Sequence, residues 1–498
     1  MKEDRLYRST DLSFRLPKGV VSHESEESFQ LVRHFPLKTI FLHTLWIPVI
    51  NLLSEGDFIP LEEILAIMKG PDPEKIEFLL NDLVRKGFLE QEGFSVLPDY
   101  PSVSVIIPVR NRPREIESCL LSLGKLDYPD HKLEIIVVDD ASTDHTPQVV
   151  SGFPARLITL KSNRQASYCR NLAAKQATGE ILAFIDSDCL ADSLWLKELI
   201  SAFKDSRVGG VGGKVASWFQ ESPLDRYEEV KSSLIMGKRF ARSQDNETFF
   251  YVPSCNLLVR RNLFLELGGF KEALFVGEDV DLCWRMQDAG YLVEFRPVGT
   301  VFHKHRNRLK PFCLRRFDYG TSEPLLQRLH KSRGKKMILP LGSSLFWSLG
   351  VLALIFKSPI ILSLCAVIVI ADSLNKRVLV RRKNIPVKIP VLLLSVLRGY
   401  FAHFYHSCAF LSRYYLIWSI PALFFSWLAF GVVWCAHLLV GITEYVIKKP
   451  RMNLLSFFFY FSLEQLFYQL GVWWGCRRYR SFQAVNPQLG LKMPSKAA

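Results

Sequence analysis

The sequence predicts an α/β protein whose central domain is built on a mostly parallel sheet. Residues 103–108 and 133–138 are short, almost unbroken apolar runs, which are typical of strands buried on both faces. Two further apolar strands and two helical segments alternate with them, at 157–160, 181–185, 114–123 and 165–176. This alternation indicates a Rossmann-like sheet, and such sheets bind ligands at the carboxyl ends of their strands.

The chain of 498 residues is too long for a single hydrophobic core, and its composition divides it. We expect four regions. They are a small N-terminal domain at 1–97, the sheet domain at 98–330, a region of transmembrane and interfacial helices at 331–482, and a disordered cytoplasmic tail at 483–498.

The N-terminal region has the pattern of a winged-helix module. A hairpin at 13–34 is expected to precede three helices and a small β-wing, at 37–53, 61–68, 73–86 and 88–94. The third helix ends at Gly87, a residue favoured where helices stop. Winged-helix modules bind DNA or peptides, and the third helix is not notably basic, so a peptide or a neighbouring domain is the expected partner.

The C-terminal region is dominated by apolar residues. Five apolar segments lie near 338–356, 359–373, 390–412, 415–446 and 453–476, and about 20 residues are needed to cross a bilayer. The third segment carries Arg398, His403, His406 and Arg413, which favour an interfacial position. We therefore expect about four crossings of the cell membrane.

The charge distribution and the cysteine content indicate the location of the protein and exclude one class of partner. The net charge of +14 comes largely from short basic clusters beside the apolar segments, as on the cytoplasmic side of membrane helices. Nucleic acid is not an expected partner, because no basic stripe is interleaved with aromatic residues. The ten scattered cysteines indicate reduced thiols. The charged residues 1–20 do not have the pattern of a signal peptide, so the sheet domain is expected to be cytoplasmic.

Acidic residues follow two of the predicted strands. Asp139 and Asp140 close the strand 133–138, and Asp186 and Asp188 follow the strand 181–185. A buried carboxylate without a partner costs several kcal/mol, so these side chains need a cation or hydrogen-bond donors. A sugar nucleotide offers both, because its diphosphate recruits Mg²⁺ or Mn²⁺ and its base and ribose donate hydrogen bonds. An isolated Asp-x-Asp is also common in turns and helix caps.

Glu278 and Asp279 begin a predicted helix. One explanation for Glu278 and Asp279 is structural, because the helix dipole favours acidic residues in the first helical turn. The other is general-base catalysis, in which a carboxylate removes a proton from an acceptor hydroxyl. His303 and His305 lie further along, and His303 is the preferred extra metal ligand, because imidazole is acceptable to Mn²⁺.

Taken together, these stretches resemble the inverting glycosyltransferases of family 2, which have the GT-A fold. The resemblance rests on five motifs in the family's order over about 200 residues: VSVIIPVRN, EIIVVDDASTD, RNLAAKQATGEILAFIDSD, LGGF, and GEDVDLCWRM followed by FHKHR. It implies metal-dependent transfer of a sugar from a nucleotide donor. Two departures stand out: Gln165 and Cys169 replace a glycine-centred turn, and the Gln-x-x-Arg-Trp motif of processive synthases is absent.

The resemblance also implies roles for individual residues. The nucleotide would be held by Pro108, Asp139, Asp140, Arg164 and Asp186, and the diphosphate would be contacted by Arg315 and Arg316. The metal would be held by Asp188 and His303, with Asp186 beside them. Asp279 would be the base with Glu278 next to it, and Trp284 would contact the acceptor.

A narrower resemblance concerns the acceptor. The stretches YVPSCNLLVRR, RRFDYGTS and GVWWG are similar to those of the mycofactocin-system glycosyltransferases. That group also carries an N-terminal region similar to PqqD-type peptide-binding modules, and it attaches glucose to a peptide-derived redox cofactor. Two alternatives stay open: a polyprenyl-linked or lipid acceptor in envelope polysaccharide synthesis, and a catalytically silent protein that holds a peptide at the membrane.

Overall fold

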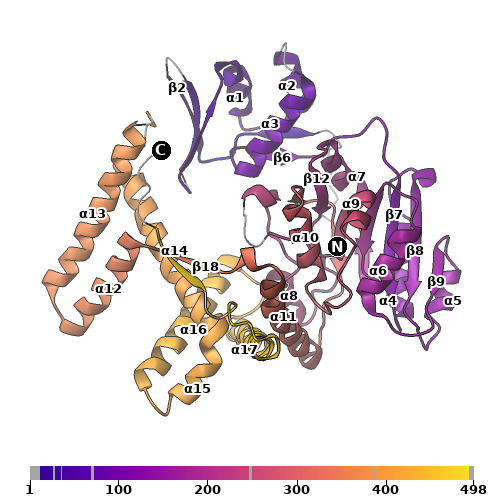
Figure 1. Ribbon diagram of the computed structural model, residues 1–498. Helices are drawn as coiled ribbons and strands as arrows, with labels where there is room; N and C mark the ends of the chain where they lie inside the picture. Colours follow the sequence, from indigo (N-terminus) through magenta and orange to yellow (C-terminus); the bar gives the residue numbers. More distant parts are fainter. Residues whose placement is uncertain are drawn as a thin grey trace. The chain divides into compact units, whose positions relative to one another are not determined.

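The computed structural model describes residues 12–25, 28–34, 36–68, 72–245, 250–382, 384–385 and 387–492. The chain forms two compact units. The first combines Met1–Glu92, Gly334–Gly441 and Val485–Ala498, and the second combines Gly93–Arg333 and Ile442–Ala484. The second unit contains the predicted sheet domain, and Figure 1 labels several of its elements.

An eight-stranded sheet forms the centre of the second unit. Its order is β14 (Ala241–Arg242), β16 (Leu292–Phe295), β12 (Val208–Gly212), β15 (Asn256–Arg260), β10 (Ile181–Ile185), β7 (Val103–Val109), β8 (Leu133–Asp139) and β9 (Arg156–Thr159). The predicted parallel arrangement is confirmed for β10, β7, β8 and β9. Strand β15 runs antiparallel to both of its neighbours, so the sheet is mixed.

Helices cover both faces of this sheet (Figure 1). They are α4 (Pro113–Leu123), α5 (Thr146–Ser151), α6 (Gln165–Gln176), α7 (Trp195–Ile200), α9 (Arg261–Glu266) and α10 (Glu278–Asp288), with 3-10 turns at η2 (Asp130–Lys132), η3 (Ser201–Lys204) and η4 (Ser243–Asp245). Successive strand residues enter opposite cores: Ala183 packs in one cluster and Phe184 in the other. Burial on both faces is why the strands are apolar without alternation.

A small second sheet carries part of the candidate site. It has the order β11 (Cys189–Ala191), β17 (Val301–His303) and β13 (Val215–Ser217). In its register Cys189 pairs with His303, and the backbone N–H of Lys304 donates to the carbonyl of Asp188 at 2.9 Å. This pairing brings two chain segments more than 100 residues apart to the same point.

Three helices complete the second unit: α8 (Pro223–Lys231), α11 (Leu309–Leu329) and α17 (Leu454–Tyr479), with the turn η5 (Lys331–Arg333) after α11. Helices α11 and α17 touch through glycines. A Cβ atom at Gly320 would lie 2.0 Å from the carbonyl oxygen of Tyr468, and one at Gly471 would lie 2.0 Å from that of Phe317. The apolar segment 453–476, expected to be long enough to cross a membrane by itself, therefore packs along a helix of the sheet domain.

The first unit contains the N-terminal strands and helices. Strands β2 (Val20–Ser25), β3 (Ser28–Arg33) and β4 (Lys38–Leu42) form one antiparallel sheet, and β5 (Ile59–Pro60), β1 (Ser13–Arg15) and β6 (Glu90–Glu92) form another. The helices are η1 (Thr44–Trp46), α1 (Ile47–Leu53), α2 (Leu61–Ile67) and α3 (Pro73–Lys86). The prediction of one helix over 37–53 is wrong for 38–42, where β-branched and aromatic residues favour a strand. Strand β6 pairs with β1.

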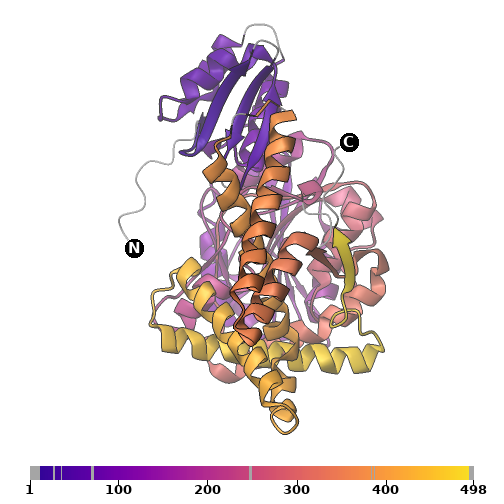
Figure 2. The same ribbon diagram turned by 90° about the vertical axis from the view of Figure 1, so that its left-hand side faces the viewer.

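The remaining helices of the chain are largely apolar. They are α12 (Leu341–Phe356), α13 (Pro359–Arg382), α14 (Ile389–Tyr415), η6 (Leu416–Trp418), α15 (Ser419–Ala422) and α16 (Trp427–Lys448). Helices α12, α13 and α14 lie side by side (Figure 2). Within the described residues, two helices are long and apolar enough to span a membrane, Pro359–Arg382 and Trp427–Lys448, rather than the four crossings expected.

The end of the chain differs from the disordered tail that we predicted for 483–498. Strand β19 (Gln488–Lys492) pairs in parallel with β18 (Lys336–Pro340). Strand formation by 488–492 satisfies backbone hydrogen bonds that a disordered tail would give to water. Residues 493–498 lie outside the described residues.

Candidate active site

The candidate site lies where strands β7, β8 and β10 end. The loops after β7 and β8 are joined by hydrogen bonds: the N–H of Thr143 donates to Asn111 Oδ1 at 2.8 Å, and the N–H of Asn111 donates to Ser142 Oγ at 2.9 Å. Asn111 and Ala141 have positive φ angles of 50° and 55°. Backbone in this region costs energy for residues other than glycine and is concentrated at functional sites.

Asp139 and Asp140 are adjacent, but their carboxylates have different partners. Asp140 accepts hydrogen bonds from the backbone N–H groups of Arg164 (2.6 Å) and Gln165 (2.9 Å), so it holds the start of α6. Asp139 is buried, and only its Oδ2 has a partner, the N–H of Ser142 at 3.2 Å. Asp139 Oδ1 is buried without a hydrogen-bond partner among the described residues. Leaving a buried acceptor unpaired costs about 1–3 kcal/mol, so this oxygen is suited to accept a hydrogen bond from a ligand.

Two other predicted nucleotide contacts flank this point. Pro108 is the penultimate residue of β7, where it pairs with Val138. The guanidinium of Arg164 lies 4.3 Å from the centre of the Tyr168 ring. Gln165, which replaces the expected glycine turn, has a positive φ of 70°. Its N–H bond to Asp140 compensates for that strained backbone.

Arg170 joins two of the predicted acids. Its guanidinium lies 2.5 Å from Asp186 Oδ1 and 3.1 Å from Glu278 Oε1, and the residue is only 3% exposed. The two carboxylates raise the pKa of Arg170 against the effect of burial, which lowers it. Arg170 is not among the site residues predicted from the sequence, although it is the first residue of the family-like RNLAAK motif. Asp186 and Glu278 are therefore held in place by one buried cation.

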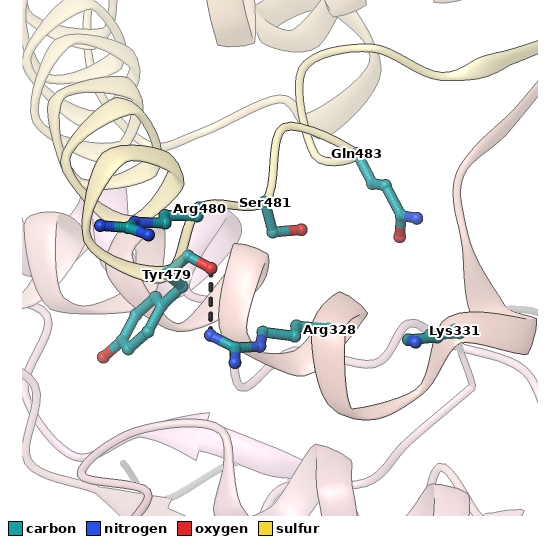
Figure 3. Close-up of a pocket in the computed structure, with 6 residues that line it drawn as sticks. All are labelled: Arg328, Lys331, Tyr479, Arg480, Ser481 and Gln483. Atoms are coloured by element: carbon teal, nitrogen blue, oxygen red, sulfur yellow. Dashed lines mark hydrogen bonds between the residues drawn. The ribbon is translucent and has the colours of Figure 1, made fainter.

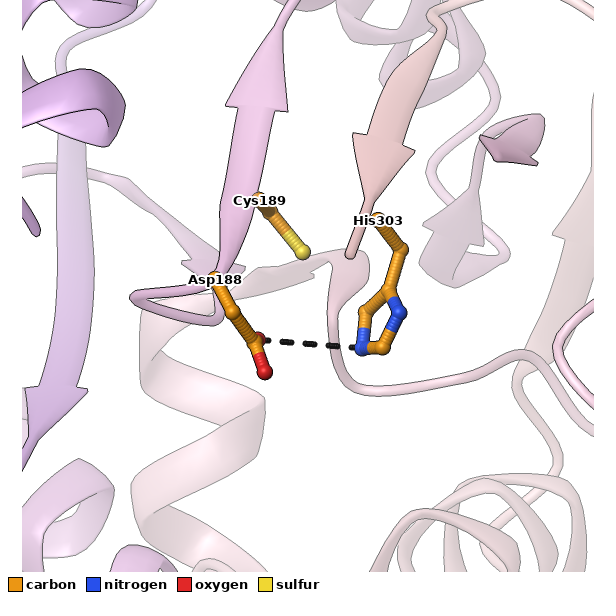
Figure 4. Close-up of side chains that lie close together, drawn as sticks. All are labelled: Asp188, Cys189 and His303. Carbon is orange, nitrogen blue, oxygen red and sulfur yellow. Dashed lines mark ion pairs between the residues drawn. The ribbon is translucent and has the colours of Figure 1, made fainter. Parts of the chain in front are cut away.

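Asp188 and His303 face each other across the small sheet (Figure 4). Asp188 Oδ1 lies 3.7 Å from His303 Nε2, and its Oδ2 forms an ion pair with Arg112. Burial raises the pKa of Asp188, but its interactions with His303 and Arg112 outweigh this effect, and the pKa is lowered. Asp188 therefore carries a negative charge at neutral pH.

The donor atoms at this point fit a divalent metal. One ligand atom each from Asp188, Cys189 and His303 lies within 4.8 Å of the others (Figure 4). His303 Nδ1 is buried without a hydrogen-bond partner in the described part of the chain. A carboxylate with an imidazole suits Mn²⁺. Burial raises the pKa of the Cys189 thiol well above its usual range, and a protonated thiol is a poor ligand.

Asp279 lies in the first turn of α10. Its Oδ2 accepts the N–H of Ser254 at 3.2 Å, and its Oδ1 accepts the N–H of Val280 at 2.8 Å. Burial, and then the negative charge of Glu278, raise the pKa of Asp279 to about 7. Gly277 precedes the helix with a φ of 84°, and a Cβ atom there would lie 2.9 Å from a methyl carbon of Leu326. Only glycine gives this helix start without strain.

Arg315 and Arg316 are neighbours with different surroundings. The Arg316 guanidinium is buried and pairs with Glu228 of α8 at 2.8 Å, so our prediction that it contacts the diphosphate is not supported by its placement. Arg315 lies 4.8 Å from the Tyr319 ring, and its Nε is buried without a hydrogen-bond partner among the described residues. The pKa of Arg306 is lowered by burial and by the nearby charge of Arg315. Arg315 and Arg306 therefore form a pair of close positive charges.

Trp284 lies in the interior and not at an open surface. It is 3% exposed and packs with Leu274 and Leu326. Its ring meets that of His330 edge to face, with centroids 5.1 Å apart. Because these contacts bury the side chain, the predicted contact between Trp284 and an acceptor is not supported.

The chain is similar to known proteins over its sheet domain and beyond. Residues 104–268 match the family described as Glycosyl transferase family 2. The chain is 27% identical over 403 residues to the pre-mycofactocin glycosyltransferase of Mycobacterium tuberculosis, covering 79% of this chain and 83% of that protein. It is 33% identical over 221 residues to glycosyltransferase AglE of Haloferax volcanii, covering 41% and 70%.

Among solved structures, the mannosyltransferase PcManGT from Pyrobaculum calidifontis, in complex with GDP-Man and Mn²⁺, matches with a TM-score of 0.37. The identity is 20%, over 66% of this chain and 92% of that chain. The family motifs, the mixed sheet covered by helices and the acids at its strand ends together describe a GT-A-like fold. The chain belongs to glycosyl transferase family 2 and is a nucleotide-sugar-dependent glycosyltransferase, a transferase of class EC 2.4.

Proposed function

We propose that this enzyme transfers a hexose, glucose, from a UDP-sugar to a hydroxyl group of a peptide-derived acceptor of the mycofactocin type, with inversion at the anomeric carbon. The similarity to the pre-mycofactocin glycosyltransferase supports this acceptor, because it extends over 403 residues and beyond the family-matching segment 104–268. In this proposal the imide N–H of the donor's uracil donates to the unpartnered oxygen of Asp139.

The observation that carries the proposal is the state of Asp279. A general base works best when its pKa is near the operating pH, and burial beside Glu278 raises the pKa of Asp279 to about 7. The two backbone N–H bonds fix the orientation of its carboxylate. Arg170 holds Glu278, so the neighbouring charge stays in place.

The transfer is a single displacement. The acceptor oxygen attacks the anomeric carbon while its proton passes to the Asp279 carboxylate. The bond between that carbon and the diphosphate oxygen breaks, and its electrons leave with UDP. Attack from the opposite face inverts the configuration, so an α-linked donor gives a β-glycoside.

Positive charge is needed where the diphosphate departs. Arg315 and Arg306 supply it from the start of α11 and the segment before it. Asp188 and His303 would hold Mg²⁺ or Mn²⁺, with Asp186 close by in sequence. When bound, such an ion neutralises charge that develops on the leaving diphosphate.

The proposal also assigns roles to the apolar helices and to the N-terminal domain. We propose that α13 and α16 anchor the protein in the cell membrane as part of a multi-pass region, with the catalytic unit on the cytoplasmic side. The N-terminal domain, with its two three-stranded sheets and three α-helices, would bind the peptide. The same apolar helices favour a second candidate acceptor, a polyprenyl-linked sugar or membrane lipid.

One experiment separates these candidates. Detergent-solubilised enzyme is incubated with UDP-glucose and with either a mycofactocin-type or a polyprenyl-linked acceptor, and the products are weighed by mass spectrometry. The expected result is a gain of one or more hexose masses on the peptide-derived acceptor, abolished by EDTA and restored by Mn²⁺. Transfer only to the lipid acceptor would overturn the proposed substrate, and no transfer from any nucleotide sugar would support the catalytically silent alternative.

A further inference from the structure

The ends of α11 and α17 border a cavity of about 370 Å³ that is open to solvent and that the transfer reaction does not use; Figure 3 shows its lining residues. It is lined by Arg328, Lys331, Tyr479, Arg480, Ser481 and Gln483. All six residues belong to the second unit. The volume is within the range of small-molecule sites.

The cavity is positively charged without compensation. Arg328, Lys331 and Arg480 line it, and no lining residue is acidic. In the described part of the chain, none of these three side chains forms an ion pair. By contrast, Arg333 in the next turn pairs with Asp288 at 2.6 Å. Three like charges around one space repel one another, and an anion bound between them would remove that repulsion.

The walls of the cavity are held by the helix ends themselves. Arg328 donates from Nη1 to the carbonyl of Tyr479 at 3.2 Å, as Figure 3 shows. Helix α17 ends at Arg480 in the left-handed conformation, and the N–H of Ser481 donates to Cys476 at 3.1 Å. Basic residues also complement helix dipoles, but that effect does not require Lys331, which lies past the end of α11.

An apolar stripe on α17 leads to this cavity. Residues three or four apart share one face of a helix, and the stripe consists of Leu455, Phe459, Leu463, Leu466, Leu470 and Trp474. Trp474 is 55% exposed, and Phe482, between two lining residues, is 52% exposed. The opposite face of α17 is buried. An exposed apolar stripe beside basic residues is typical of a helix that lies in the membrane interface, where tryptophan is also enriched.

We propose that the cavity binds the phosphate group of an anionic membrane lipid, with the apolar stripe of α17 in the interfacial layer next to it. Inorganic phosphate shares the recognised chemistry, but it would use neither the stripe nor Phe482. The inference rests on the membrane location proposed above and is independent of the acceptor. It assigns to α17 the role of seating the catalytic unit against the membrane surface.

The test uses the full chain in a neutral detergent. Dissociation constants for phosphatidylglycerol and phosphatidylcholine are measured by native mass spectrometry, and inorganic phosphate is added as a competitor. The variant is Arg328→Gln/Lys331→Gln/Arg480→Gln. The matched control, Lys125→Gln/Lys175→Gln/Lys238→Gln, removes the same charge from exposed residues that neither line the cavity nor flank an apolar helix. Thermal unfolding and glucosyl transfer in detergent are recorded for all three proteins.

The expected result is binding of phosphatidylglycerol in preference to phosphatidylcholine, weakened at least about tenfold in the cavity variant and less than about twofold in the control. Equal weakening in both variants would overturn the site, because only overall charge would matter. Phosphate binding that depends on the cavity, without lipid binding, would overturn the lipid assignment. Transfer in detergent should be unchanged in the cavity variant, which distinguishes failure of this inference from failure of the proposed reaction.

Discussion

The two sides of helix α10 hold aspartates with opposite properties. Asp279 faces the candidate site, where burial and Glu278 raise its pKa to about 7. Asp281, two residues later, is fully buried and contacts three groups: Lys271 Nζ at 2.9 Å, Arg285 Nε at 2.7 Å and His330 Nε2 at 2.9 Å. Burial raises the pKa of Asp281 as well, but these partners lower it to about 2.

The difference shows that two aspartates at the start of one helix have separate roles, Asp279 in the proposed catalysis and Asp281 in stability. Among the described residues, Asp279 accepts hydrogen bonds from two backbone N–H groups, and burial with the charge of Glu278 raises its pKa to about 7, so it exchanges its proton near neutral pH. Asp281 forms ion pairs with Lys271 and Arg285 and stays ionised. Arg285 also donates to the carbonyls of Leu267 (2.7 Å) and Gly269 (2.6 Å). The Asp281 side of the helix therefore holds the LGGF turn, and the Asp279 side is left for chemistry.

Replacing the site-facing acid should have the largest effect. Asp279→Asn removes the proposed base without changing the side-chain size, and we expect glucosyl transfer to fall roughly 10³-fold. Binding of UDP should be retained, because Asp279 is not among the predicted nucleotide contacts. Initial rates and UDP affinity by calorimetry check both points. Near-normal transfer in this variant would show that another group accepts the proton.

Replacing Asp281, the acid that faces the core, should lower the stability of the folded state. Asp281→Asn leaves Lys271, Arg285 and His330 around a neutral side chain, and we expect a loss of about 3 kcal/mol in the free energy of unfolding. Chemical denaturation measures this loss. Asp279→Asn serves as the matched control and should be at least as stable as the wild type at neutral pH, because a neutral side chain avoids the cost of ionising a buried acid. Similar stability of the two variants would contradict the separation of roles.

The glycine before α10 tests the geometry that both acids share. Gly277→Ala places a Cβ atom 2.9 Å from Leu326 at a φ of 84°, and we expect a cost of roughly 1–3 kcal/mol in unfolding free energy. Transfer should also decline, because the first turn positions Asp279. Gly290→Ala is the control, since its φ is 87° but no atom lies within 4 Å of the added Cβ. Equal losses would indicate that backbone strain alone decides the effect.

The two acids should also respond to pH with opposite signs. The raised pKa of Asp279 means that the folded state holds its proton more tightly, so its contribution to stability is lost as pH rises from about 4 to about 7. The lowered pKa of Asp281 gives stability above about pH 4 that is lost as pH falls toward 2. For catalysis the base must be ionised, so kcat/KM should fall about tenfold per pH unit below 7.

Stability and rate are measured across these ranges for the wild type and for Asp279→Asn. The variant should no longer show the decline in stability between pH 4 and 7. A wild-type rate that stays constant from pH 5 to 8 would contradict a pKa near 7 for the base.

Sequence reasoning reached the acids of the site but not all of their partners. The strand-end positions of Asp186 and Asp188 and the helix-start position of Asp279 follow from local patterns. Arg170 and Arg112, which pair with two of these acids, are ordinary charged residues in their own segments. An ion pair between α6 and the end of β10 exists only after the sheet has formed, so no local pattern reveals it.

The sequence alone determined the α/β class, the order of the strands along the chain and the acids that end them, because apolar runs and helix signals act over a few residues. The tertiary structure decided which acids are chemically available. Asp140 is used to hold α6, Arg316 pairs with Glu228 88 residues away, and α17 lies along α11 through paired glycines. Each of these arrangements depends on segments that are distant in the sequence. Such segments bury a side chain and place charges beside it, and burial and nearby charges set its pKa more strongly than its neighbours in sequence do.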